Sequence, residues 1–473
     1  MQKILIFLLL INLSYQFDVN KKTLKVFVIE INPILTSITN KDLYKNNNGH
    51  PYVTEYFSQK REKSVSEMVN DIKFASHGKL TVQIVKHAVL NEFPKYTSKI
   101  KLSNGKYDFK YDEKTYISMS KSDQKDKGDW FKLIRDPLFS DSFKFDYDYI
   151  INKYNLITLR EKKFFDQVWI FGVDPLGAFE TMMVGSNPYW INGTPLKKDC
   201  KNFLIAGFAL ARRDSSLHAL GHALENLISF GFSGDYNKYT DKVITEEEYN
   251  KLNYWEKFTL INKNTKNKNA GVGNVHYPFN GINDYDYSNT NQVYSYWESW
   301  LNYPNINKAK KLSNNKAWME LSENVKILKD PEAEKNPDRL YVRFWMYLFP
   351  HIDGYTAKGQ LNNWWSYFSN LDYVTQINSQ NQMVTGYVGK EVELNYNVYY
   401  RSGDIEKVKY AKQDKNVHIN GNCVKFNNNK QLIGAQKGKC TVSIFRDGQK
   451  VTIVINVLAA TTKNLRKFIN FKN

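Results

Sequence analysis

The residues best suited to chemistry lie between Asp214 and Ile228, in the stretch Asp-Ser-Ser-Leu-His-Ala-Leu-Gly-His-Ala-Leu-Glu-Asn-Leu-Ile. His218, His222 and Glu225 are spaced i, i+4 and i+7, which places them on one face of a helix. Two imidazoles one helical turn apart can bind a single Zn²⁺ at about 2.0–2.1 Å. A catalytic zinc site then needs one more protein ligand and a water molecule. The spacing therefore predicts two ligands of a zinc site.

The third ligand has to come from another segment. We favour His276, which lies in the loop Gly-Asn-Val-His-Tyr-Pro at residues 273–278, and Glu225 and His351 are the alternatives. A hydrolase also needs a carboxylate that accepts a proton from the attacking water. Glu225 or Glu180 could supply it. Each of these histidines could instead be structural, and Glu225 could be a solvated helix residue, so the ligand set is a hypothesis.

A strand, a turn and a helix are predicted around the two histidines. The apolar run 203–210 indicates a buried strand, and one stripe of the following segment is rich in leucine, as in an amphipathic helix. Asp214 or Ser215 can cap this helix, and Gly231 and Gly234 can end it. The two histidines then lie on a helix that directly follows a core strand.

Strands and helices alternate along the preceding and following sequence. This alternation predicts an α/β (α+β) fold for an N-terminal domain at residues 17–380. The clearest elements are strands at 24–29, 80–89 and 167–172, and helices at 64–75, 245–260 and 338–349. Trp364 and Trp365 are interpreted as core residues rather than as a platform for sugars.

The pattern changes near residue 383. From there to residue 458, short alternating runs separated by Asn, Gly and Asp predict a β-rich domain. The segments Gly-x-x-Val-x-Leu at 389–394 and Gly-x-Cys-x-Val at 438–442 resemble the bacterial Ig-like group 2 family, which implies an Ig-like β-sandwich. Cys423 and Cys440 lie close together here, so a disulfide is plausible in an oxidising compartment, and the state of Cys200 stays open.

The strand, the turn and the His-x-x-x-His helix resemble the active helix of zincin-type metallopeptidases. The resemblance implies zinc bound by His218 and His222. In zincins a glutamate directly follows the first histidine and acts as the general base, whereas this chain has Ala219. A peptidase would therefore need Glu225 or Glu180 in that role.

A wider stretch, from about residue 22 to 370, resembles a group of secreted, mostly bacterial proteins that carry no assigned substrate. The shared motifs are Val-Trp-Ile-Phe-Gly at 168–172, Phe-Glu at 179–180, Gly-His-x-x-Glu at 221–225, Gly-Asn-Val-His-Tyr at 273–277 and Asn-Asn-Trp-Trp at 362–365. In that group a glutamate often stands at the position of His218. The resemblance implies a site but no particular reaction.

The N-terminus has the pattern of a secretory signal peptide, which we place at residues 1–16. Its apolar run, residues 4–13, is too short for a spanning helix, which needs about 20 residues. We expect a secreted or extracellular protein without a transmembrane segment in the mature chain. The sequon Asn192-Gly193-Thr194 is a candidate glycosylation site in a surface loop.

The net charge of +18 comes mainly from lysine, because only 10 of the 66 basic residues are arginine. The lysines are scattered among asparagines, as at residues 261–269, and a short basic tail follows at 459–473. A nucleic-acid groove usually gathers arginine and lysine around aromatic side chains. We therefore expect no nucleic-acid partner.

These observations favour a secreted, metal-dependent hydrolase, peptidase-like, that uses Zn²⁺. The alternative is a non-catalytic secreted or surface protein that binds a glycan or a protein, and Ala219 together with the β-rich domain favours it. The substrate or ligand, peptide or glycan, does not follow from the sequence.

Overall fold

The structure is a computed structural model, and it describes residues 22–36, 54–96, 112–113, 144–172, 176–209, 216–232, 242–265, 269–306, 310–324, 336–356, 360–371, 374–379, 381, 383–400, 405–409, 417–446 and 449–459. The predicted signal peptide, the predicted caps Asp214 and Ser215, Gly234 and most of the basic tail lie outside these residues. The chain forms two compact units. The first comprises Met1–Ile352 and Asn363–Ser369, and the second Asp353–Asn362 and Asn370–Asn473.

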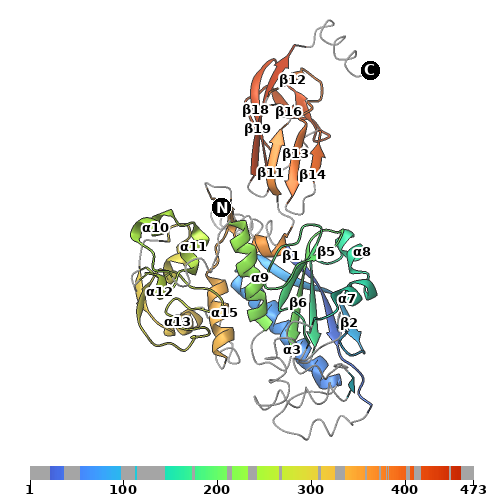
Figure 1. The fold of residues 1–473 in the computed structure, drawn as a ribbon. Helices are drawn as coiled ribbons and strands as arrows, with labels where there is room; N and C mark the ends of the chain where they lie inside the picture. Colours follow the sequence, from blue (N-terminus) through green and yellow to red (C-terminus); the bar gives the residue numbers. More distant parts are fainter. Residues whose placement is uncertain are drawn as a thin grey trace, which may run out of the picture. The chain divides into compact units, whose positions relative to one another are not determined.

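A six-stranded mixed sheet forms the centre of the first unit (Figure 1). Its strands are β1 (Lys22–Ile31), β2 (Leu80–Leu90), β3 (Gln167–Gly172), β4 (Thr181–Gly185), β5 (Leu196–Lys197) and β6 (Phe203–Ala209). The order is β2-β1-β3-β6-β4-β5. Neighbours among β2, β1, β3 and β6 are parallel, whereas β4 is antiparallel to β6. The four strands predicted in this unit are thus confirmed, with small shifts at their ends.

Helices cover both faces of this sheet, which explains why strands such as β3 and β4 are buried on both sides. They are α3 (Thr54–Ala75), α7 (Tyr147–Lys153), α8 (Leu156–Glu161), α9 (Ser216–Gly231) and α16 (Trp365–Ser369). One face, with Val168 and Ile170, packs against α7 and α8. The alternate residues of β3 lie on the other face, where Gln167 Nε2 donates to Phe368 O of α16 at 3.3 Å. Helix α3 contacts β2, and α9 contacts β6 and β4.

Short helices follow α9 in the chain. The elements here are α10 (Glu246–Lys251), α11 (Tyr254–Thr259), α12 (Asn262–Thr265), β7 (Val293–Ser295), η2 (Trp297–Asn302), β8 (Lys311–Ser313), α13 (Lys316–Asn324) and α15 (Pro337–Tyr347). The prediction of one helix at 245–260 is wrong, because Asn253 is extended and caps a new helix by accepting the N–H of Glu256. Helix α15 begins as expected, with Pro337 in its first turn.

Aromatic side chains fill the core between these helices. Trp255, Trp345, Trp364 and Trp365 are fully buried, and the ring of Trp364 lies 5.4 Å from that of Trp255. The interpretation of Trp364 and Trp365 as core residues is therefore confirmed. Much of the high aromatic content of the chain serves packing.

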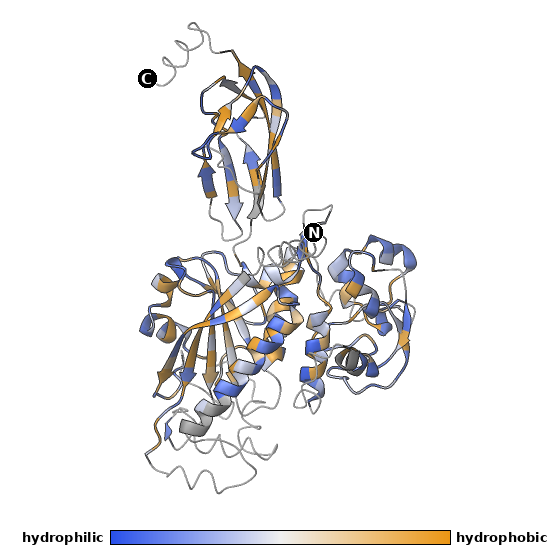
Figure 2. Ribbon diagram, turned by 180° about the vertical axis from the view of Figure 1, so that it is seen from behind, coloured by the Kyte–Doolittle hydropathy of each residue, from blue (hydrophilic) through white to orange (hydrophobic). Residues whose placement is uncertain are grey.

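The second unit is rich in β-structure. Its strands, with the β9–β10 pair that precedes them, are β9 (His351–Tyr355), β10 (Leu361–Asn363), β11 (Val374–Ser379), β12 (Met383–Tyr387), β13 (Tyr396–Tyr400), β14 (Ile405–Val408), β15 (Val417–Asn420), β16 (Val424–Phe426), β17 (Leu432–Gly434), β18 (Gly438–Arg446) and β19 (Gln449–Leu458). They form sheets in the orders β11-β13-β14, β12-β19-β18-β15 and β16-β17. Figure 2 shows polar and apolar residues alternating along these strands, and the apolar ones meet in one core.

The predicted pairing of cysteines is present in this unit, where Cys423 and Cys440 form a disulfide. Cys200 is buried in the first unit. Among the described residues, no helix is both long enough and apolar enough to cross a bilayer.

Candidate metal centre

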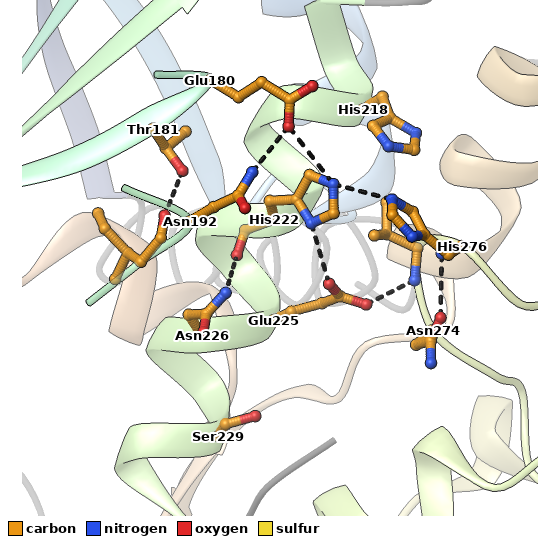
Figure 3. A network of polar contacts seen from close by, with 12 residues as sticks. Glu180, Thr181, Asn192, His218, His222, Glu225, Asn226, Ser229, Asn274 and His276 are labelled. Atoms are coloured by element: carbon orange, nitrogen blue, oxygen red, sulfur yellow. Dashed lines mark hydrogen bonds and ion pairs between the residues drawn. The ribbon is translucent and has the colours of Figure 1, made fainter. Parts of the chain in front are cut away.

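Three imidazoles converge in the first unit (Figure 3). His218 and His222 project from α9, and His276 comes from the loop that follows α12. One ring nitrogen from each lies within 4.8 Å of the other two. The Nε2 atoms of His222 and His276 are 3.1 Å apart, close to the roughly 3.3 Å expected between two ligands of a tetrahedral ion. No other group of three such side chains occurs within the described ranges.

Helix α9 is held firmly in the core by its apolar stripe. The buried residues of this stripe are Leu217, Leu220, Leu224, Leu227 and Ile228. Gly221, between the two histidines, lets the His276 loop approach, because a Cβ there would lie 2.6 Å from Val275 Cγ2. The helix therefore presents its ligand face directly to the loop.

The His276 loop is fixed by hydrogen bonds of its backbone. Asn274 Oδ1 accepts the N–H groups of His276 at 3.0 Å and Tyr277 at 2.8 Å. The hydroxyl of Tyr341, on α15, donates to Asn274 O at 2.9 Å. Gly273 has φ +103°, and a Cβ there would collide with Tyr277 O, so the turn requires glycine. The third imidazole is thus positioned before any ligand binds.

Each of the three imidazoles has a carboxylate beside its Nδ1 atom. The pairs are His218 with Asp338 at 3.0 Å, His222 with Glu225 at 3.4 Å and His276 with Asp284 at 3.5 Å. A carboxylate at Nδ1 keeps the proton there and leaves Nε2 free to bind a metal ion. This is the arrangement that histidine ligands of metal ions usually have.

Glu225 contacts both the helix that carries His222 and the loop that carries His276. Its side chain is 0% exposed, so the alternative of a solvated helix residue is wrong. Its Oε1 accepts the N–H of Val275 at 2.5 Å, next to His276. Within the described part of the chain, Glu225 Oε2 and His222 Nδ1 are buried without a hydrogen bond that meets ordinary geometric limits. A zinc ion on Nε2 would fix the proton of His222 on Nδ1, facing Glu225, so these residues fit the ion.

Glu180 reaches the same centre from the sheet. It directly precedes β4, and its backbone O accepts the N–H of Gly207 on β6 at 3.0 Å. Its Oε2 lies 3.4 Å from His222 Nε2, and the side chain is 45% exposed. Asn192 Nδ2 donates to the same oxygen at 2.7 Å. Figure 3 shows Glu180 and Glu225 on opposite sides of the His222 ring.

Two groups at the centre were not singled out from the sequence. Asp338 lies 120 residues after His218, and no local pattern links them. The hydroxyl of Tyr285 lies 3.0 Å from His276 Nε2, and its backbone has φ +60°, an uncommon value for an aromatic residue. A non-glycine residue held at positive φ is a recognised sign of a functional site. The positive φ of Tyr285 can be seen in the structure but not in the sequence.

The charges around the imidazoles shift their pKa values in opposite directions. Burial lowers the pKa of His218, but the hydrogen bond to Asp338 and the negative charges of Asp338 and Glu180 outweigh burial, so the net pKa is raised. Burial and the neighbouring His222 lower the pKa of His276. Metal binding requires a neutral ring at each ligand, a state that His276 reaches more readily than an ordinary imidazole and His218 less readily.

His351, the alternative third ligand, lies outside this cluster. Its ring stacks on that of His77 at 3.7 Å. His77 Nε2 donates to Tyr347 O at 2.8 Å, and burial together with the adjacent His351 lowers the pKa of His77 to about 4. Burial lowers the pKa of His351 as well, so these two stacked rings form a separate pair in which protonation is disfavoured.

No family profile and no curated protein match the chain. The solved structures that resemble a part of it include the following two. A crystal structure of domains 4 and 5 of the S-layer protein SbsC matches 19% of this chain and 54% of its own length, with 17% identity and a TM-score of 0.14. A solution structure of a proposed surface protein matches 19% of this chain and 93% of its own, with 15% identity and a TM-score of 0.13. The chain thus spans about half the length of the first structure.

Proposed function

We propose that this protein is a secreted, zinc-dependent hydrolase of the peptidase type. The observation that carries the proposal is the convergence of three imidazoles, each with a carboxylate at Nδ1. His218, His222 and His276 would hold the ion through nitrogen atoms. Three protein ligands with an open fourth position are typical of catalytic rather than structural zinc.

A zinc ion in this place supplies a Lewis acid that lowers the pKa of bound water to about 7 and polarises a carbonyl group. Glu180 Oε2, 3.4 Å from His222 Nε2, would accept a proton from the attacking water and later pass it to the leaving amine. The partial exposure of Glu180 leaves room for a substrate. Asn192 keeps its carboxylate in place.

We assign the proton transfer to Glu180 rather than to Glu225. Both oxygens of Glu225 face protein groups, namely Val275 N and His222 Nδ1, and the side chain has no exposed surface. Such a carboxylate orients its neighbours but cannot reach a substrate. Glu180 would therefore replace the zincin glutamate that is missing at Ala219.

Metal analysis combined with a peptide-hydrolysis assay tests the proposal. Wild-type protein should contain about one zinc per chain and lose activity with a chelator. His222→Ala should lose both zinc and activity, whereas Glu180→Gln should keep zinc and lose roughly 10²- to 10⁴-fold in turnover. His418→Ala, at an exposed histidine of the second unit, is the matched control and should change neither. Wild-type protein without bound metal would refute the proposal.

The alternative is a non-catalytic secreted or surface protein that binds a glycan or a protein. Ala219 and the β-rich second unit, which would fit an Ig-like β-sandwich serving as a spacer, favour it. Binding of a glycan or protein ligand that persists in His222→Ala and in chelator, without any hydrolysis by wild type, would support this alternative.

A further inference from the structure

We propose that Asn192 positions the carboxylate of Glu180, and that a glycan on Asn192 switches the centre off. This inference rests on the proposed function. The sequence Asn192-Gly193-Thr194 is a sequon, and its asparagine side chain points toward the imidazoles (Figure 3). A sugar attached to this amide nitrogen would stand directly beside the carboxylate that the nitrogen holds.

The contact that carries the inference joins the sequon to the metal centre in two steps. Asn192 Nδ2 donates to Glu180 Oε2 at 2.7 Å. The same oxygen lies 3.4 Å from His222 Nε2. Glu180 is 45% exposed, so solvent surrounds much of its side chain, and the Asn192 amide is a direct restraint on its carboxylate.

The backbone around Asn192 cannot readily shift to turn the amide away. Thr181 Oγ1 donates to Ile191 O at 2.5 Å, which fastens the segment to β4. At Gly193 a Cβ would lie 2.6 Å from Thr181 O, so the segment lies directly on the strand. Asn192 itself has φ +79°, a left-handed conformation that asparagine tolerates better than most residues.

N-glycosylation would change the atom that makes this contact. A lipid-diphosphate-linked oligosaccharide of the secretory pathway donates the sugar: the bond from sugar C1 to the diphosphate oxygen breaks, the bond from Nδ2 to C1 forms, and Nδ2 loses one proton. The sugar would then be attached to the nitrogen that lies 2.7 Å from Glu180 Oε2. One N–H would remain on Nδ2, but the bulky, hydrated sugar would not fit against Glu180. With the backbone fixed, the Asn192 side chain would rotate about its own bonds, turn outward and release Glu180.

Two variants distinguish the effect of losing the Asn192 amide from the effect of losing the sequon. Thr194→Ala, at an exposed residue, destroys the sequon and keeps the Asn192 side chain. Asn192→Asp destroys the sequon too, has the same shape, and places a second carboxylate against Glu180. In protein made in bacteria that do not glycosylate, Thr194→Ala should match wild type. Asn192→Asp should keep its zinc, change the visible spectrum of the Co²⁺-loaded protein and lower kcat about 10- to 100-fold, the effect of one hydrogen bond to a charged group.

Wild-type protein exported from glycosylating eukaryotic cells tests whether a glycan on Asn192 inactivates the centre. A lectin first separates the chains that carry a glycan from those that do not. The glycosylated fraction should contain as much zinc as Thr194→Ala but share the Co²⁺ spectrum and low kcat of Asn192→Asp. A glycosylated fraction as active as Thr194→Ala would overturn the inference, as would export without any glycan at Asn192. If Thr194→Ala binds zinc but hydrolyses nothing, the proposed function fails, while the Co²⁺ spectra still test the position of Glu180.

Discussion

Replacing Glu225 by glutamine tests how the centre holds its ligands. The carboxylate accepts one hydrogen bond from Val275 N and faces His222 Nδ1 with its other oxygen. Glutamine has the same shape but only one accepting oxygen. With that oxygen on Val275 N, its NH₂ group faces His222 Nδ1, which must then lack a proton. The proton of His222 moves to Nε2, the atom that should bind the metal.

The structure therefore predicts an affinity defect without a folding defect. In the metal-free Glu225→Gln protein the neutral His222 ring can accept the new N–H, so stability should change little. Binding zinc forces the proton back to Nδ1 and places two buried donors against each other, which costs about 1–3 kcal/mol. Loss of such a carboxylate partner typically weakens metal binding 10- to 100-fold, equivalent to about 1.4–2.7 kcal/mol. The two estimates agree.

Competition with a chelator of known zinc affinity measures the expected loss of zinc affinity. Thermal unfolding of the metal-free protein measures the stability, which should change little. Asp284→Asn is the matched control, because this carboxylate is 55% exposed and lies 3.5 Å from His276 Nδ1, so its loss should matter less. Equal zinc affinity in Glu225→Gln and wild type would refute the reasoning. So would a metal-free variant that is unfolded.

Three further outcomes follow from other parts of the molecule. Gly221→Ala should weaken zinc binding with all ligands intact, because the added methyl group would lie 2.6 Å from Val275 Cγ2, and chelator competition measures it. Burial and the adjacent His351 lower the pKa of His77 to about 4. Its contribution to stability is therefore fully present above pH 6.5 and is lost as the pH falls toward 4; the upper bound is about 3–4 kcal/mol before discounting for solvent. Denaturant unfolding of His77→Asn, which suits the left-handed backbone at this position, should show a flatter dependence on pH in that window. Replacing Cys423 and Cys440 together by serine should cost about 2–4 kcal/mol in the unfolding of the second unit and leave zinc binding unchanged.

The parts of the centre that depend on local spacing could be predicted from the sequence. His218 and His222 are one helical turn apart on an amphipathic helix, so any fold that buries the leucine stripe directs both rings to one side. His276 could be singled out because glycine and proline mark its loop. The strands of the sheet could be predicted for the same reason, because short apolar runs bounded by turn residues are a local sequence signal.

The partners of these residues could not be predicted, because they come from distant segments. Asp338 meets His218 only after α15 packs beside α9. The sequon suggested a surface loop, yet the Asn192 side chain turns inward to Glu180, a contact fixed by how the segment lies on β4. The break at Asn253 was missed because a helical pattern of apolar residues runs across it, while a side-chain cap decides the boundary.

Glu180 directly precedes strand β4 of the sheet, whereas His218 and His222 belong to the helix α9. In an enzyme whose base and ligands share one helix, the distance between them is set by the helix itself. Here it depends on how firmly α9 sits against β4 and β6. Under the proposed function, warming that loosens this packing should therefore lower the rate of hydrolysis at a temperature at which the zinc ion is still bound.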